Sequence, residues 1–410
     1  MRVSKVKGCL IYVLAFFPIF DFILVNISIL LFLLGSAINF KKNESVFRRP
    51  NIKLVFGFLL LSLPFLMNVI SLCWTQDIRT GVSFVERTVP FFLLSIAFIF
   101  LKPFRTKESI DKFIRLYIIS NAVLGFLVLL YVIPGMFIYS HNIESLVTSE
   151  SMGKFFRDVV ETIPIIGEHP IYLSLMTGSS LLFLFYIRFR QRWVNATMSF
   201  LFVVILFLSS SRGPTIALLI AICVVILLNK MSAKTKIAVF GAFFLFTTFG
   251  LFYSPLKSRL MEFVNTKHIY PQGDYFNSFN TRMGIYKCSF EIGRNAPWYG
   301  LGPGDVQSNL DLCYNQYETN AYNTGIFNTH NQYLFYWLSF GTVGLFLFIG
   351  SYTIFIRHAY LVKENIYIVF LTYMLVCFLT ENILSRNTGI MLFAIFNIMF
   401  YCKSHINDSN

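Results

Sequence analysis

Residues 331–356 read NQYLFYWLSFGTVGLFLFIGSYTIFI, and these 26 positions hold no charged side chain. The hydrocarbon core of a bilayer is about 30 Å thick, which takes about 20 residues of helix to cross. This stretch is therefore long and apolar enough to span a membrane. The chain as a whole has 410 residues, 56% of them hydrophobic and only 13% charged. That composition predicts an all-α integral membrane protein and excludes an ordinary soluble domain.

Apolar blocks of similar character recur along the chain, and no tandem repeat or soluble domain interrupts them. We therefore expect a single integral membrane domain over residues 1–410, with about twelve transmembrane helices. Residues 9–35 could instead form one long helix in place of the spans 8–22 and 24–39, since the turn between Pro18 and Asp21 is a weak signal. The expected spans are, within a few residues, 8–22, 24–39, 53–73, 82–101, 112–133, 170–187, 193–210, 214–229, 237–253, 331–356, 366–384 and 388–402.

The formal net charge of +14 indicates topology rather than nucleic-acid binding. The basic residues lie beside the hydrophobic blocks and are not interleaved with aromatic residues on a polar face. Lys and Arg near span ends favour the cytoplasm. Most of the 34 fall on one side when alternate boundaries are counted as inside, provided that 8–22 and 24–39 form a hairpin. Segments 134–169, which could hold a short helix, and 254–330 are then extracytoplasmic.

Residues 254–330 form the only sizeable polar segment, and this loop precedes the third-last expected helix. It contains Cys288 and Cys313, which could form a disulfide if the segment is extracytoplasmic and their geometry allows. The other five cysteines lie in or beside apolar blocks and are expected to pack there without reacting.

Ionisable residues are nearly absent from the middle of the expected spans. A coupled transporter would need them there, because they line ion or proton paths. They gather instead near the outer ends of helices, which favours chemistry at one membrane interface. The residues concerned are Asp21, Glu86, Arg87, Arg212, Glu381 and Arg386.

Arg212 stands in SSSRGP, between two spans, where Gly213 and Pro214 let the chain turn and begin a helix. An arginine beside the free N–H groups of a helix start suits a phosphate. The alternative is an interfacial arginine that reaches lipid headgroups. The surrounding motif favours the functional interpretation.

Arg282 opens an expected amphipathic helix that ends near Gly293 and is followed by the glycine-rich turn 300–304. Taken alone this is a weak signal. His330 begins HNQYL, where the loop enters a span. Its imidazole could remove a proton from a sugar hydroxyl at neutral pH. The equal alternative is a segment that caps the helix, with Asn331 as a capping residue.

His169 has a matching position before the expected span 170–187, where it could orient an acceptor or serve only the helix start. Glu381 and Arg386, in TENILSRNTGI, could form an ion pair that holds two helices. We predict no metal site, because neither HExxH nor an outer DxD occurs, and no cofactor, because no Walker loop or dinucleotide fingerprint occurs.

Three pieces of the chain together resemble the O-antigen ligase and polymerase family. They are SSSRGPTIALL (209–219), TRMGIYKCSFEIGRNAPWYGLGPGD (281–305) and THNQYLFYWLSFGTVGLFLF (329–348). The resemblance covers residues 165–400 in detail, including part of the site in the loop 254–330. The loop lacks a second HN or a long soluble domain, which sets the chain apart from the larger protein O-oligosaccharyltransferases of the superfamily.

The resemblance implies a metal-independent, inverting glycosyltransferase of the bacterial inner membrane, with its active site facing the periplasm. Its donor would be a glycan on undecaprenyl diphosphate. Arg212 and Arg282 would bind the diphosphate and stabilise the departing charge, and His330 would deprotonate the acceptor hydroxyl. The residues expected to bind substrate are His169, Asn331, Glu381 and Arg386.

Three functions remain open from the sequence. The leading hypothesis is a polymerase of O-antigen, capsule or exopolysaccharide repeat units, with a possible chain-length regulator as partner. The second is a ligase that moves the glycan to lipid A-core. The third, of another class, is a lipid-linked oligosaccharide flippase or other transporter.

Overall fold

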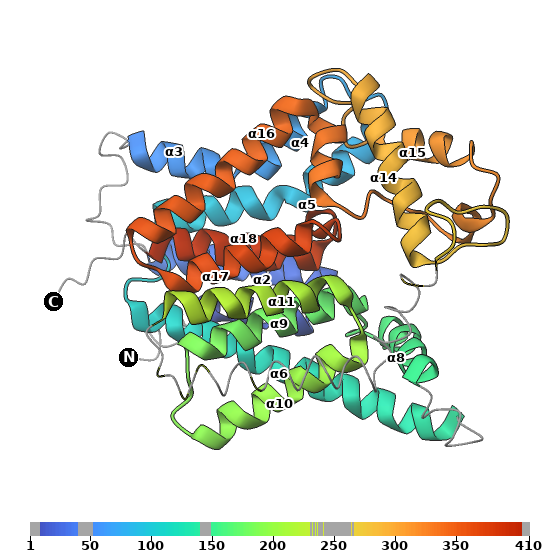
Figure 1. Cartoon of the computed structure of the whole chain (residues 1–410). Coiled ribbons are helices and arrows are strands. Elements are labelled where there is room, and N and C mark those ends of the chain that lie inside the picture. Colours follow the sequence, from blue (N-terminus) through green and yellow to red (C-terminus); the bar gives the residue numbers. More distant parts are fainter. Residues whose placement is uncertain are drawn as a thin grey trace.

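The structure, a computed structural model, describes residues 9–39, 52–139, 149–229 and 266–403, with five isolated positions between 232 and 264 (Figure 1). Within these residues the regular structure is helical, apart from two isolated β-bridges, Gln272 with Tyr275 and Gly273 with Thr319. The all-α prediction is confirmed for this part of the chain.

The helices follow the expected spans closely. In the first half they are η1 (Leu14–Ile19), α2 (Phe22–Asn39), α3 (Ile52–Leu61), α4 (Leu63–Ser71), α5 (Ile78–Ile96), η2 (Ala97–Leu101), α6 (Lys107–Tyr139) and α8 (Ser149–Thr162). In the second half they are α9 (Pro170–Tyr186), α10 (Arg192–Ser209), α11 (Arg212–Leu228), α14 (Ser278–Asn295), α15 (Val306–Tyr314), η3 (Ala321–Thr324), α16 (Gln332–Leu361), α17 (Asn365–Phe378), η4 (Ile383–Ser385) and α18 (Asn387–Lys403).

The apolar helices differ in whether they are long enough to cross a bilayer. Among the described residues, four helices are long and apolar enough to cross a bilayer: Ile78–Leu101, Lys107–Gly135, Arg192–Ser209 and Gln332–Leu361. Six more are apolar but have only 10–17 residues. The expected span 237–253 lies outside the described residues. The figure of about twelve spans therefore stays a prediction.

Local sequence explains where the helices break. The first helix ends at Ile19 and α2 starts at Phe22, so the expected hairpin at Pro18 to Asp21 is present. The expected span 53–73 is divided at Ser62, just before Pro64, whose ring cannot supply a backbone hydrogen bond. Helix α16 is kinked at Gly341, which has a φ of 66°.

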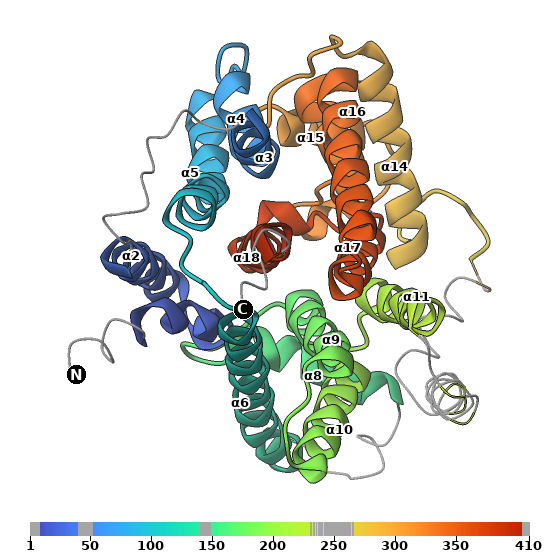
Figure 2. The ribbon, with the colours of Figure 1, turned by 90° about the vertical axis from the view of Figure 1, so that its left-hand side faces the viewer.

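Helix α18 forms the centre of the bundle (Figure 2). Every residue from Gly389 to Phe400 is buried. The helix contacts α3, α5, α6, α9, α16 and α17. A helix that is apolar and covered on all sides belongs inside a bundle.

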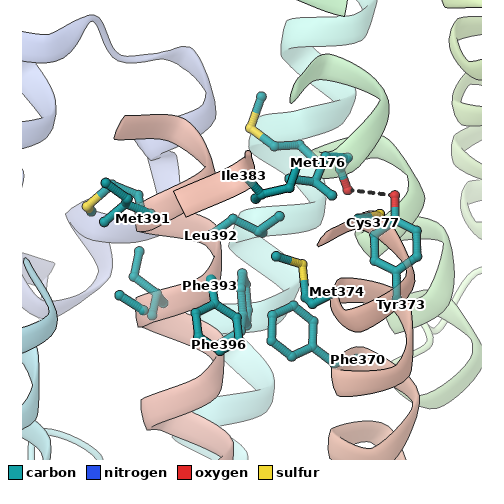
Figure 3. Packing of buried hydrophobic residues seen from close by; sticks show 14 of the residues in the cluster. Met176, Phe370, Tyr373, Met374, Cys377, Ile383, Met391, Leu392, Phe393 and Phe396 are labelled. Carbon is teal, nitrogen blue, oxygen red and sulfur yellow. Dashed lines mark hydrogen bonds between the residues drawn. The ribbon is translucent and has the colours of Figure 1, made fainter. Parts of the chain in front are cut away.

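Aromatic and sulfur-containing side chains fill the space between α18 and its neighbours (Figure 3). Phe396 packs against Phe183 of α9, with ring centroids 4.7 Å apart. Tyr373 of α17 donates a hydrogen bond to the Leu175 carbonyl of α9 at 3.2 Å, so its buried hydroxyl is satisfied. Helices in lipid associate through such packing and hydrogen bonds, because lipid tails are as apolar as the side chains.

Helices α14 and α15 form a layer at one end of the bundle, opposite the end where α18 finishes (Figure 1). Cys288 of α14 is bonded to Cys313 of α15, which settles the pairing that the sequence left open. Helix α14 spans the segment predicted to be helical after Arg282 and starts four residues earlier. Helix α8 confirms the short helix expected within 134–169.

The glycine-rich turn 300–304 attaches this layer to α16. The N–H groups of Leu301 and Gly302 donate to the carbonyls of Leu338 and Ser339, each at 2.8 Å. A Cβ atom at Gly300 would lie 2.4 Å from the Gly341 nitrogen, so only glycine allows this approach. The contact fixes the α14–α15 layer over the kink of α16.

Candidate functional site

The candidate site lies where the start of α16 meets the segment that joins α17 to η4. Asn382, which is buried, connects the two. Its side-chain oxygen accepts hydrogen bonds from the Thr329 hydroxyl at 2.9 Å and from the Asn331 N–H at 2.8 Å. The residue between these two donors, His330, is thereby held against the 380–382 segment.

His330 contacts a buried carboxylate. Its Nδ1 lies 3.0 Å from Oε2 and 3.2 Å from Oε1 of Glu381. The Glu381 side chain is 9% exposed and that of His330 is 24% exposed. A carboxylate can only accept, so the neutral imidazole carries its proton on Nδ1. Nε2, which has no hydrogen-bond partner among the described residues, then has a free lone pair.

The backbone of His330 is strained in support of this geometry. Its φ is 43°, in the left-handed region that non-glycine residues rarely adopt. The Asn328 side chain accepts a hydrogen bond from the His330 N–H at 2.8 Å. Such strain costs about 1–3 kcal/mol and collects at functional sites.

Electrostatics keeps Glu381 ionised. Burial by itself would raise the pKa of this carboxyl. The contact with His330, the charge of Arg282 and the Asn382 N–H together outweigh burial and lower the pKa below its ordinary value. Glu381 is therefore an anion at neutral pH.

Helix α14 brings Arg282 to the same carboxylate. Its Nη2 lies 4.0 Å from Glu381 Oε2, and its Nη1 donates to the Thr380 carbonyl at 3.2 Å. Tyr286, one helical turn later, places its hydroxyl 3.5 Å from the His330 carbonyl oxygen. The helix begins at a capping box in which the side chains of Asn277 and Asn280 each bind the other's backbone N–H. This start orients the face that carries Arg282 and Tyr286.

Arg212 reaches the site from α11. It is the first residue of that helix, and its Nη2 donates to the Ser278 hydroxyl of α14 at 3.2 Å. A Cβ atom at Gly213 would lie 2.1 Å from Thr380 Oγ1, so glycine lets α11 start directly against the 380–382 segment. The structure thus brings Arg212, Arg282, His330 and Glu381 together around Thr380.

His169 lies at the start of α9 and has a capping role. Its Nδ1 accepts from the Ile171 N–H at 3.3 Å, and its Nε2 lies 3.4 Å from Glu161 Oε1. Burial lowers the pKa of His169 below its ordinary value. The charge of Arg386 also lowers it, and the charges of Glu161 and Glu381 oppose this shift without reversing it. Substrate binding by His169 stays a prediction.

The expected ion pair between Glu381 and Arg386 is wrong. Glu381 pairs with His330 and Arg282, whereas the guanidinium carbon of Arg386 lies 5.7 Å from the centre of the Tyr172 ring. Between them the chain makes the short 3-10 turn η4, whose Ile383 and Leu384 are buried. The turn separates the two charges.

Asn331 caps α16, as one of the two interpretations of this segment expected. Its side-chain oxygen accepts from the N–H groups of Tyr333 and Leu334 at 2.9 and 3.1 Å. Its amide nitrogen donates to the Leu379 carbonyl at 3.2 Å. Asn331 therefore supports the site through the backbone, and a direct contact with substrate stays a prediction.

Three residues of the site escaped the sequence analysis. Tyr286 could have been found, because it lies four positions after Arg282 on the same helical face. Asn382 and Thr380 carried no such signal, since their roles depend on packing between segments that are 53 and 98 residues apart in the chain. No group of three or more possible metal-binding side chains occurs among the described residues.

This arrangement combines a base, an anion that orients it and two cations. It suits the removal of a proton from a hydroxyl next to a bound phosphate or diphosphate. Comparison with known families agrees: residues 197–349 match the family model described as O-antigen ligase. The match includes Arg212, Arg282 and His330 and ends before Glu381. No curated protein matches the chain.

Proposed function

We propose that this chain, a member of the O-antigen ligase and polymerase family, is a glycosyltransferase that takes its glycan from undecaprenyl diphosphate. The observation that carries the proposal is the contact of His330 with Glu381 beside Arg282. A histidine oriented by a buried carboxylate is the arrangement of a general base. Its neighbour Arg282 gives the same pocket a positive charge.

Arg212 and Arg282 are proposed to bind the donor diphosphate. Arg212 donates to Ser278 at the start of α14, and Arg282 lies one turn later on that helix, so the two arginines belong to one site. The N–H groups at the start of α11 add a favourable dipole. These groups also stabilise the negative charge that develops on the leaving diphosphate, which is electrostatic catalysis.

His330 is proposed to activate the acceptor. Its Nε2 takes the proton of an acceptor hydroxyl while that oxygen bonds to the anomeric carbon of the donor sugar. The bond from this carbon to the lipid diphosphate breaks at the same time, and attack from the opposite face inverts the anomeric centre. Glu381 stabilises the imidazolium that results. The proposed step is metal-independent, since the two arginines supply the positive charge.

The acceptor decides between two forms of this activity. Our leading candidate is a polymerase that joins lipid-linked repeat units of O-antigen or capsule, because a cell can hold several polysaccharide loci but usually one ligase. The description of the matched family favours the second candidate, a ligase that delivers the glycan to lipid A-core. A flippase or other transporter is less well supported, because the charged groups described here gather at one end of the bundle.

The proposed location is the inner membrane, with the site facing the periplasm. The disulfide between Cys288 and Cys313 supports this orientation for the α14–α15 layer, because disulfides persist in oxidising compartments. The layer lies at the opposite end of the bundle from Lys403, which belongs to the basic residues expected in the cytoplasm (Figure 1).

The deciding experiment is the glycan profile of a deletion strain complemented with the wild-type gene, Arg282→Ala or His330→Ala, at equal protein levels. A single repeat unit on the lipid or core, with no polymer, would identify a polymerase. Polymer that stays on undecaprenyl diphosphate and never reaches lipid A would identify a ligase. Normal glycans in both variants would overturn the catalytic proposal and favour transport.

A further inference from the structure

A second polar cavity lies beside the candidate site. Its volume is about 530 Å³, and its walls come from the turn before α2, from α5, from the α8–α9 loop and from the start of α18. None of the groups proposed to bind the donor lines it. The cavity is therefore distinct from the proposed donor contacts.

Two arginines supply the positive charge in the lining of the cavity. Arg87 extends from α5 and donates to the Ser385 carbonyl at 3.2 Å, and Arg386 lies over the Tyr172 ring. Both side chains are exposed, and neither has an ion-pair partner within 4.0 Å among the described residues. The carboxylates of Asp21 and Glu168 also line the cavity, but neither forms an ion pair with Arg87 or Arg386. The guanidinium donors can therefore bind a phosphate or a sugar carboxylate.

The rest of the wall suits a carbohydrate. Asp21, Asn387 and Ser385 offer hydrogen-bonding groups, and Phe22 offers an exposed aromatic surface. Sugars are commonly held by such a mixture, in which polar groups bind hydroxyls and an aromatic ring covers an apolar face. The cavity thus fits an anionic, hydroxyl-rich ligand.

The α8–α9 loop, which lines the cavity, carries backbone strain. Ile165 has a φ of 69°, which is rare for a β-branched residue, and its side chain is 76% exposed. A Cβ atom at Gly167 would lie 2.6 Å from the Ile163 carbonyl oxygen, so the loop is tightly folded here. Strain of this kind clusters at active sites and ligand-binding loops, which agrees with a binding role for this wall of the cavity.

The cavity and the candidate site share one wall. Ser385 to Thr388 line the cavity, and Glu381 of the same segment contacts His330. Tyr172 connects the two, because its hydroxyl donates to the Asn382 carbonyl at 3.2 Å while its ring contacts Arg386. A glycan bound in the cavity would therefore contact the segment that carries Glu381, the partner of the proposed base.

We infer that this cavity is the acceptor subsite, which binds an anionic glycan through Arg87 and Arg386. The inference rests on the proposed function and adds to it a second substrate position. Acceptor glycans carried on a lipid diphosphate or on a phosphorylated core share this chemistry. A phospholipid headgroup is the competing source of the same anion.

Photocrosslinking in the native membrane tests the inference. The full chain would carry p-benzoyl-phenylalanine in place of Phe22, which lines the cavity and is 58% exposed. The matched control carries it in place of Phe346 of α16, which is 68% exposed and does not line the cavity. Adducts would be purified and identified by mass spectrometry and by periodate staining for glycans.

We expect a glycan adduct at Phe22 and none at Phe346. The adduct should persist in Arg282→Ala, which affects the donor site. It should fall at least about tenfold in Arg87→Ala/Arg386→Ala, because each lost charged contact costs about that factor. The single variant Arg386→Ala, compared at equal membrane levels, should also lower the yield of the glycan adduct. It replaces the double variant in this test if the double variant does not accumulate.

A phospholipid-only adduct at Phe22 would overturn the inference in favour of a headgroup site. A glycan adduct with the same yield in the arginine variants would overturn it as well. The proposed function has a separate test: normal surface glycans in a strain that carries Arg282→Ala would contradict it.

Discussion

Two histidines at the same end of the bundle each contact a glutamate, and their surroundings differ. His330 lies 3.0 Å from Glu381, whose side chain is 9% exposed, and Arg282 lies beside the pair. His169 lies 3.4 Å from Glu161, whose side chain is 49% exposed. One carboxylate is enclosed by the protein, and the other extends into solvent.

The difference shows which ring nitrogen each histidine can use. His169 accepts a backbone N–H on Nδ1 and directs Nε2 to Glu161, so both nitrogens are engaged. His330 uses only Nδ1, and among the described residues its Nε2 is open. A carboxylate on one nitrogen and an open second nitrogen make a base, whereas two engaged nitrogens make a helix cap.

Replacing the two histidines in turn is the strongest test of this contrast. We expect His330→Ala to lower the rate of glycan transfer about 10²- to 10⁴-fold, the usual contribution of a general base. His169→Ala should lower it less than about tenfold, because its two ring nitrogens contact the Ile171 N–H and Glu161 and leave none open to take a proton. Transfer would be measured in membranes supplied with the lipid-linked glycan of the deletion strain. Equal losses in both variants would contradict the assignment.

Replacing Arg282, which supplies the positive charge beside His330, should have the next largest effect on transfer. Arg282→Lys keeps the positive charge but loses the forked donors that contact the Thr380 carbonyl and face Glu381. We expect a loss of about 10²-fold in transfer, as for other donors that stabilise a developing anion. The control is Lys287→Arg, on the same helix, whose ammonium lies 3.9 Å from Glu291. This control should transfer at the wild-type rate.

A third test compares the two carboxylates, Glu381 and Glu161, by replacing each with its amide. In Glu381→Gln the amide cannot stabilise the imidazolium of His330, so transfer should fall about 10- to 100-fold. Glu161→Gln is the matched change at His169 and should leave transfer within about twofold, because an exposed pair contributes little. A normal rate in Glu381→Gln would show that His330 acts without an orienting anion.

Stability should also depend on pH through Glu381. The pKa of Glu381 is lower in the folded chain than in the unfolded chain, where it is about 4.3. The ionised carboxylate therefore stabilises the fold fully at pH values above about 4.3. That contribution is lost as pH falls through the lower folded value. Thermal unfolding should therefore show wild type more stable than Glu381→Gln by about 1–3 kcal/mol near pH 7. The difference should shrink below pH of about 4.3, and a constant difference would contradict it.

The smallest expected effect concerns His169 as a cap. His169→Ala removes the acceptor for the Ile171 N–H and should destabilise the protein by about 1 kcal/mol. His169→Asn, which keeps a capping oxygen, should recover most of this loss in thermal unfolding. A larger loss of transfer than of stability in both variants would instead support a role for His169 in binding substrate.

Local pattern predicted more of the fold than of the site. Every expected span within the described residues has a helix at its place, because long apolar blocks between polar turns specify helices directly. Arg212 and His330 could be selected because each stands at a helix start beside glycine, proline or asparagine. Arg282 could be selected because its segment resembles the family motif. Whether they meet was beyond such patterns, and their convergence on Thr380 comes from helix packing.

The pairing of Glu381 shows the limit of local spacing. Five residues from Arg386, it was expected to bind this neighbour, but η4 buries Ile383 and Leu384 and divides the charges. Its true partner is 51 residues away in the chain. Only the docking of α16 against the end of α17, fastened by Asn382, creates that contact.

The buried position of α18 has a consequence for biosynthesis. Ribosomes make this helix after the helices that surround it, yet Gly389 to Phe400 fill the middle of the finished bundle. The earlier helices must therefore remain apart, or part again, to admit it from the translocon. Glu381 and the start of α18 arrive together, so His330 gains its carboxylate only as the bundle closes. A nascent or truncated product that stops before α18 would lack both its central helix and an ordered active site.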